Sequence, residues 1–217
     1  MPREKTPRPT EAPSAPAGDS SVWNIPNRIT MARLFLSLLV FCALHVESYG
    51  WAAILFVVAV GTDFVDGYLA RRWNQVSQFG RIVDPLADKV VICGVYIFLA
   101  ARSDSLVAPW MAVVVMVREL VVTVIRSFLE QHGRDFSATW AGKLKMVLQS
   151  VAAVASLWLT HGYASGTAVP RWLPSFTQGA LWIAIAMTIY SGAMYIPAAL
   201  RLFSQVGDPG EGANGQA

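Results

Sequence analysis

The chain has 217 residues, of which 54% are hydrophobic and 14% are charged, and its formal net charge is +3. Soluble domains carry about 25% charged residues, so this composition excludes an ordinary water-soluble domain and indicates that much of the surface faces lipid. The positive charges are spread along the chain, which excludes the clustered basic surface of a nucleic-acid-binding protein.

The two ends of the chain are polar. Residues 1–20 are rich in Pro, Ala and charged residues. They cannot bury enough apolar surface to fold, so we expect a disordered tail. The first apolar stretch starts near Ile29, too far along the chain for a cleaved signal peptide. Residues 204–217 form a second polar tail, which leaves residues 21–203 as one transmembrane domain.

Between the tails, six hydrophobic segments each have about the 20 residues that a helix needs to cross a bilayer. They cover residues 30–46, 51–71, 82–101, 107–129, 141–160 and 178–200. A backbone that spans a membrane must satisfy its own hydrogen bonds, so these segments are predicted to be helices. The expected fold class is an all-α integral membrane protein.

Lys and Arg are divided unequally between the two sets of connections. One set contains Arg28, Arg71, Arg72, Arg81, Arg134, Lys143, Lys145 and Arg201. The other set contains only Arg102 and Arg171. Cytoplasmic loops are enriched in basic residues, so this pattern places both termini on the cytoplasmic side of the cell membrane. The even number of segments agrees with this topology.

Four aspartates lie where the second segment ends and the third begins, in GTDFVDGYLARR and FGRIVDPLADK. They are Asp63, Asp66, Asp84 and Asp88. An ionised aspartate inside a bilayer costs about 2.5–3.5 kcal/mol, which packing alone does not explain. At about 100° per residue, each pair faces one direction, and an antiparallel hairpin can bring the two pairs together. Such carboxylates suit hard cations, so we expect Mg²⁺ or Mn²⁺, with two ions clamping a phosphorus centre.

The residues between the aspartates suit a phosphate ligand. Gly67 and Ala70 share the helix face of Asp66 and lack bulk, so a substrate can approach the backbone. Arg71 offers a fork of donors that matches phosphate. Gly80 allows the chain to turn back before the third segment.

The spacing of these residues matches a known signature. Asp63-x2-Asp66-Gly67-x2-Ala70-Arg71-x8-Gly80-x3-Asp84-x3-Asp88 agrees with that of the CDP-alcohol phosphotransferase family at all eight fixed positions. The chain therefore resembles this family. Further likenesses to the bacterial members that make phosphatidylglycerophosphate lie in NIPN at 24–27, RRWN at 71–74, DPLADK at 84–89, RE at 118–119 and GKLK at 142–145.

The resemblance implies a fold and a set of site residues. The fold would be six transmembrane helices around a polar cavity that faces the cytoplasm, usually in a homodimer. Asp63, Asp66, Asp84 and Asp88 would form the metal site, with Asp84 bridging two ions and Asp88 also acting as the general base. The CDP group would contact Ile25, Pro26, Asn27, Arg28, Gly67, Arg71 and Ser77.

The resemblance also implies a reaction, in which sn-glycerol 3-phosphate attacks CDP-diacylglycerol and CMP leaves. The acceptor phosphate needs cations, and Arg118, Arg126, Lys143 and Lys145 are the candidates. Lys143 and Lys145 could instead be anchors at the membrane surface. Arg118 and Arg126 lie deeper in an apolar segment, where an internal ion pair with Glu119 or an aspartate is the alternative.

Two other classes of function remain open. Relatives with the same aspartate motif use other acceptors, namely phosphatidylglycerol in cardiolipin synthases, inositol phosphate or serine. The NIPN and GKLKM stretches favour glycerol 3-phosphate by resemblance. The non-enzyme alternative is an ion transporter with intramembrane aspartates, but the chain is short, has no inverted repeat, and carries its charges near one face.

Overall fold

The computed structural model describes residues 25–73, 78–131 and 140–197, and the two predicted tails lie outside these residues. The described chain is helical and contains no strand. Its elements are α1 (Ile25–His45), α2 (Tyr49–Trp73), α3 (Gln78–Ala100), the short 3₁₀ helix η1 (Ser103–Ser105), α4 (Pro109–Gln131), α5 (Trp140–Ala164) and α6 (Trp172–Ala193). The predicted all-helical class is confirmed.

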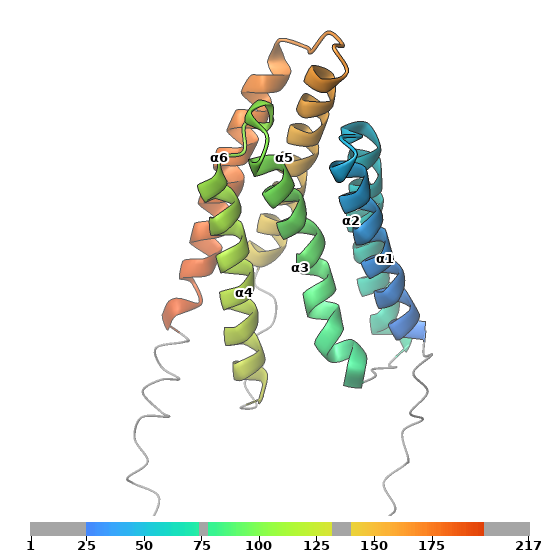
Figure 1. Ribbon diagram of the computed structural model, residues 1–217. Helices are drawn as coiled ribbons and strands as arrows, with labels where there is room; N and C mark the ends of the chain where they lie inside the picture. The colour runs from blue at the N-terminus through green and yellow to red at the C-terminus, as the bar shows by residue number, and fades with distance from the viewer. Residues whose placement is uncertain (1–24, 74–77, 132–139, 198–217) are drawn as a thin grey trace, which may run out of the picture.

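Consecutive helices run in opposite directions, so α1 begins and α6 ends at the same end of the bundle (Figure 1). We call this the entry end, and the opposite end, which carries Ser103–Ser105, the η1 end. α2 and α4 also end at the entry end, and α3 and α5 begin there. The second and third segments thus run in opposite directions, as a hairpin requires, although α2 and α3 make few contacts with each other among the described residues.

The helix boundaries follow the hydrophobic segments, with one clear difference. The last segment was predicted at 178–200, but α6 covers Trp172–Ala193. It can start early because Pro174 lies in the first turn, where a backbone N–H would have no helical partner in any case. It ends at a turn in which the Tyr195 amide donates to the Gly192 carbonyl at 3.0 Å.

Most of the buried side chains in the bundle are apolar, and they are tightly packed. α1 packs on α2 and α3, α2 packs on α5, and α5 packs most extensively on α6. The largest fully buried apolar side chains are Tyr96, Phe56, Leu99, Leu157, Leu159 and Leu181. α1 and α3 approach closely at Gly94, where an added Cβ would lie 2.3 Å from the Phe41 ring. The Phe41 ring also stacks on Phe98, with centroids 5.9 Å apart.

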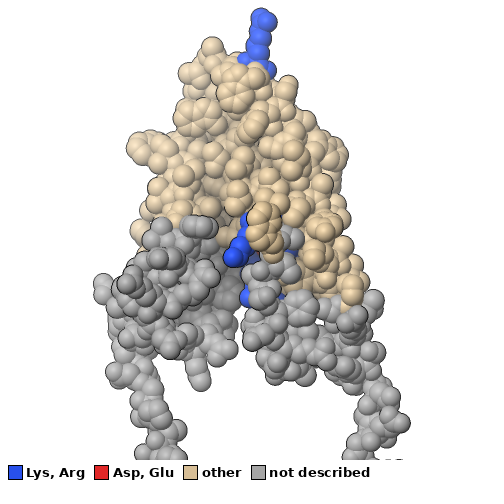
Figure 2. Space-filling view, turned by 180° about the vertical axis from the view of Figure 1, so that it is seen from behind, with Lys and Arg blue, Asp and Glu red and all other residues tan. Residues whose placement is uncertain are grey.

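The outer surface is also apolar. Every helix exposes large hydrophobic side chains, for example Leu38, Ile54, Ile97, Val124, Val147 and Ile183. On the face drawn in Figure 2, described Lys and Arg side chains appear only at the tip opposite the entry end and in a recess toward the entry end. Among the described residues, α6 is the helix that is long and apolar enough to cross a membrane, and Met31–His45, Tyr49–Thr62 and Lys89–Ala100 are shorter apolar stretches.

A set of ion pairs around Arg102, which we call the clip, lies at the η1 end. The Arg102 guanidinium pairs with Asp104 at 3.3 Å and with Glu47 at 3.4 Å, and it lies over the Tyr49 ring at 5.5 Å. The hydrogen bond to Asp104 raises the pKa of Arg102, although a guanidinium is charged at any ordinary pH even without this bond. The clip joins the α1–α2 connection to the segment after α3, far along the bundle from the aspartates.

Candidate active site

The aspartate motif falls on two helices that meet at the entry end. Asp63 and Asp66 belong to the second half of α2, and Asp84 and Asp88 to the first half of α3. Gly67 and Arg71 follow on α2. The side chains of these six residues, and those of Ile25, Pro26, Asn27, Arg28 and Ser77, lie outside the described part of the structure. Within the described part, no group of three or more His, Cys, Asp or Glu could hold a metal ion.

A second set of polar residues lies inside the bundle, where α4, α5 and α6 meet. We call it the α4–α6 polar cluster, and it consists of Arg118, Glu119, Lys145, Gln149, Thr188 and Ser191. Glu119 and Lys145 are each 4% exposed. The Lys145 ammonium donates a hydrogen bond to Glu119 Oε1. Arg118 Nη1 donates to the same oxygen at 3.3 Å.

The other members tie the cluster to neighbouring helices. Arg118 Nη2 donates to Ser191 Oγ of α6 at 3.0 Å. Gln149 Nε2 of α5 donates to Thr188 Oγ1 of α6 at 2.8 Å. The Tyr96 hydroxyl of α3 donates to the Gln149 backbone carbonyl at 3.1 Å. A buried polar group is costly unless it finds a partner, so these bonds fix how α3, α4, α5 and α6 face one another.

Local helix geometry explains why these residues share one site. Lys145 and Gln149 are four residues apart on α5, and Thr188 and Ser191 are three apart on α6, so each pair lies on one helix face. Gly192 leaves room for the stem of Arg118, because a Cβ there would lie 3.2 Å from Arg118 Cγ.

The four candidate acceptor-binding cations divide into two groups. Arg118 and Lys145 meet at Glu119, so the internal ion pair anticipated for Arg118 is confirmed. Lys145 is buried, unlike an anchoring lysine at a membrane surface. Lys143 is exposed on α5, and Arg126 is exposed on α4 two turns beyond Arg118. The structure thus assembles a buried basic centre around one carboxylate.

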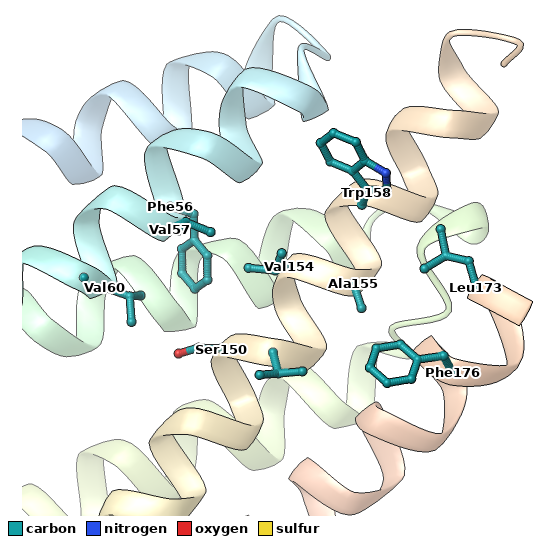
Figure 3. A pocket seen from close by; sticks show the side chains of 11 residues that line it. Phe56, Val57, Val60, Ser150, Val154, Ala155, Trp158, Leu173 and Phe176 are labelled. Carbon is teal, nitrogen blue, oxygen red and sulfur yellow. The ribbon is translucent and has the colours of Figure 1, made fainter. Parts of the chain in front are cut away.

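An apolar groove of about 510 Å³ runs between α2, α5 and α6 (Figure 3). Its lining comprises Phe56, Val57, Val60, Gly61, Ser150, Val151, Val154, Ala155, Trp158, Leu173 and Phe176. The lining is almost wholly hydrocarbon, so the groove can accommodate an apolar chain but offers no charged partner to a phosphate. It reaches Gly61, two residues before Asp63 on α2.

Comparison with known proteins identifies the family of this chain. A sequence model of CDP-alcohol phosphatidyltransferases matches residues 23–190, which include the aspartate motif and the α4–α6 polar cluster up to Thr188. This chain belongs to the CDP-alcohol phosphatidyltransferase family. The family assignment confirms the resemblance seen in the sequence and makes the chain a transferase.

Individual relatives support this family assignment. The CDP-diacylglycerol–glycerol-3-phosphate 3-phosphatidyltransferase of Bacillus subtilis (strain 168) is 35% identical over 192 residues, which cover 80% of this chain and 94% of the relative. Proteins of the same name from Sodalis glossinidius and Pectobacterium atrosepticum are 31% and 32% identical, over 81% and 82% of this chain and 94% and 95% of the relatives.

Members of the CDP-alcohol phosphatidyltransferase family are membrane enzymes that generally use divalent metal ions. In this member, the sequence alone located the motif and the basic residues but missed Gln149, Thr188, Ser191 and Tyr96 as polar contacts of the bundle. Glu119 was considered only as a possible partner for an arginine. Polar residues recurring at three- or four-residue spacing within apolar segments were the available signal.

Proposed function

We propose that this protein transfers the phosphatidyl group of CDP-diacylglycerol to sn-glycerol 3-phosphate, giving phosphatidylglycerophosphate and CMP. Relatives covering about four-fifths of the chain bear the name of this activity. The structural observation that favours a small phosphorylated acceptor over a second lipid is the buried pair of cations, Arg118 and Lys145, held on Glu119. A small phosphorylated acceptor needs such a basic centre, whereas a second lipid as acceptor needs lateral access.

We propose that residues 21–203 form one membrane domain of six spanning helices around a cavity open to the cytoplasm, between polar tails at 1–20 and 204–217. The apolar side chains exposed on every helix support this proposal. Exposed tryptophans near both ends of the bundle, among them Trp51, Trp140 and Trp172, suit the two membrane interfaces. The entry end would face the cytoplasm, because its connections carry most of the basic residues. A homodimer in the plasma membrane is the expected assembly.

The metal site would consist of Asp63, Asp66, Asp84 and Asp88. This donor set contains only carboxylate oxygens, which fits two Mg²⁺ or Mn²⁺ ions and does not fit softer metals. Bound metal ions would supply positive charge that neutralises the pyrophosphate of the donor.

Different residues of the chain would bind the acceptor and accept its proton. Arg118, Arg126, Lys143 and Lys145 would bind the acceptor phosphate and direct its 1-hydroxyl group toward the donor. As that oxygen forms a bond to the phosphorus next to diacylglycerol, Asp88 takes its proton and the bond from this phosphorus to the oxygen of CMP breaks. Holding both substrates in line away from bulk water supplies most of the acceleration.

The CDP-lipid would occupy the neighbouring surface. Its CDP group would contact Ile25, Pro26, Asn27, Arg28, Gly67, Arg71 and Ser77. One acyl chain would lie in the apolar groove between α2, α5 and α6, because the groove is lined by hydrocarbon and reaches Gly61, two residues before Asp63 on α2.

CMP release by the purified protein tests this function directly. CDP-diacylglycerol is supplied with Mg²⁺ or Mn²⁺, and glycerol 3-phosphate, inositol phosphate, serine and phosphatidylglycerol are offered one at a time. Metal-dependent release with glycerol 3-phosphate alone is the expected result. Release only with another acceptor would overturn the proposed acceptor, and no release with any acceptor would favour the transporter.

A further inference from the structure

We infer that Glu119 is a positioning residue that sets the acceptor site by holding Lys145 and Arg118 together, so that both cations bind one phosphate group. Glu119 itself would touch neither substrate. This inference rests on the proposed function and extends it to a residue outside the aspartate motif and outside the four candidate cations.

The contacts of the carboxylate carry the argument. Lys145 Nζ and Arg118 Nη1 bind the same oxygen, Glu119 Oε1. Their side chains are only 5% and 10% exposed, so water does little to screen their mutual repulsion. One carboxylate therefore keeps two positive charges adjacent in an apolar interior. Among the described members of the cluster, two positive charges face one negative charge, so one positive charge is left for an anionic ligand to neutralise.

The hydrogen bonds of Arg118 also support a phosphate-binding site. Its guanidinium is fixed on one side by Glu119 and on the other by Ser191. Its Nε is buried and has no hydrogen-bond partner among the described residues. A guanidinium is suited to binding phosphate with more than one N–H, and an unsatisfied buried donor is costly. A phosphate oxygen would satisfy this donor.

A purely structural role for Glu119 makes a different prediction. In that case the carboxylate only neutralises two buried cations, and its loss would reduce the amount of folded protein without favouring one substrate. If Glu119 positions the acceptor site, its loss would raise the KM of the acceptor selectively.

The test compares Glu119→Gln and Glu119→Asp with the control Glu47→Gln, which removes the carboxylate that pairs with Arg102 at the η1 end. KM for glycerol 3-phosphate, KM for CDP-diacylglycerol and kcat are measured on folded protein. Glu119→Gln is expected to raise the acceptor KM by about tenfold or more, the scale of one charged hydrogen bond, and to change the donor KM by less than about twofold. Glu119→Asp should recover part of the loss, and Glu47→Gln should match the wild type.

Equal changes in the two KM values, or no change in either, would overturn the inference. If Glu119→Gln does not fold, Ser191→Ala provides the same test, because it removes one anchor of Arg118 and leaves all charges in place. It is expected to raise the acceptor KM by about threefold, and an unchanged acceptor KM would overturn the inference. Absence of CMP release by the wild-type protein with glycerol 3-phosphate would instead refute the proposed function.

Discussion

Lys145 of α5 donates a hydrogen bond to Glu119 of α4, and each of the two side chains is only 5% exposed. A charge pair so deep in a helical bundle is retained at a cost, because both groups have left water. Arg118 and Ser191 extend the pair across to α6. The pair thus links the packing of three helices to the site where we place the acceptor phosphate.

The first prediction concerns stability. Lys145→Met should lower the free energy of unfolding by about 3 kcal/mol, the lower end of the range for breaking a buried pair, because Arg118 still partly compensates Glu119. The matched control is Lys143→Met, which changes an exposed lysine on the same helix. It should change the free energy of unfolding, and therefore the unfolding temperature, much less than Lys145→Met does. Thermal unfolding in detergent measures both variants, and equal shifts would contradict the prediction.

The second prediction concerns the aspartates. Asp63→Asn or Asp84→Asn should lower CMP release more than about 100-fold, since even residues that only support a metal ligand contribute 10–100-fold. Both variants should remain folded. Asp104→Asn, at the η1 end, is the control and should keep wild-type turnover. Substantial activity in either motif variant would rule out the proposed metal site.

The third prediction concerns Arg126. If its guanidinium contacts the acceptor phosphate, Arg126→Ala should raise the KM for glycerol 3-phosphate by about tenfold and leave that for CDP-diacylglycerol nearly unchanged. Arg171→Ala removes a basic residue at the far end of the bundle and should alter neither KM. An Arg126 variant with equal effects on both substrates would exclude this role.

The fourth prediction concerns the apolar groove. Val151→Trp adds bulk to the groove wall and should raise the KM for long-chain CDP-diacylglycerol several-fold, while a short-chain donor should be much less affected. Val113→Trp places the same ring on the exposed face of α4 and serves as the control. The same KM change for long and short chains would show that the groove does not hold an acyl chain.

The fifth prediction concerns the contact between α1 and α3. Gly94→Ala should destabilise the bundle by about 1–3 kcal/mol, because the new Cβ collides with the Phe41 ring and the core must shift. Combining it with Phe41→Leu should restore part of the loss. Thermal unfolding of the single and double variants measures this coupling, and additive losses would indicate that the ring is not the cause.

The sequence by itself determined the number and class of the long helices in the part of the chain that the structure describes. A long apolar segment in a membrane has to become a helix, because only a helix satisfies all the backbone hydrogen bonds of a single segment. This rule depends only on local composition. The aspartate motif was equally visible, because its eight residues lie on two consecutive segments. The opposite directions of α2 and α3 followed from their being consecutive spanning segments. The start of α6 was placed wrongly because Pro174 was taken as a break, although a first helical turn accepts it.

Only the tertiary structure decided which polar residues meet. Lys145 and Glu119 are 26 residues apart, and Arg118 and Ser191 are 73 apart. Whether they touch depends on the rotation of each helix about its axis and on which helices are neighbours. Hydrophobic periodicity gives little guidance here, because these helices are apolar on their outer faces as well as inside. For the same reason the groove between α2, α5 and α6 could not be foreseen: it arises from three helices packing, and no single segment encodes it.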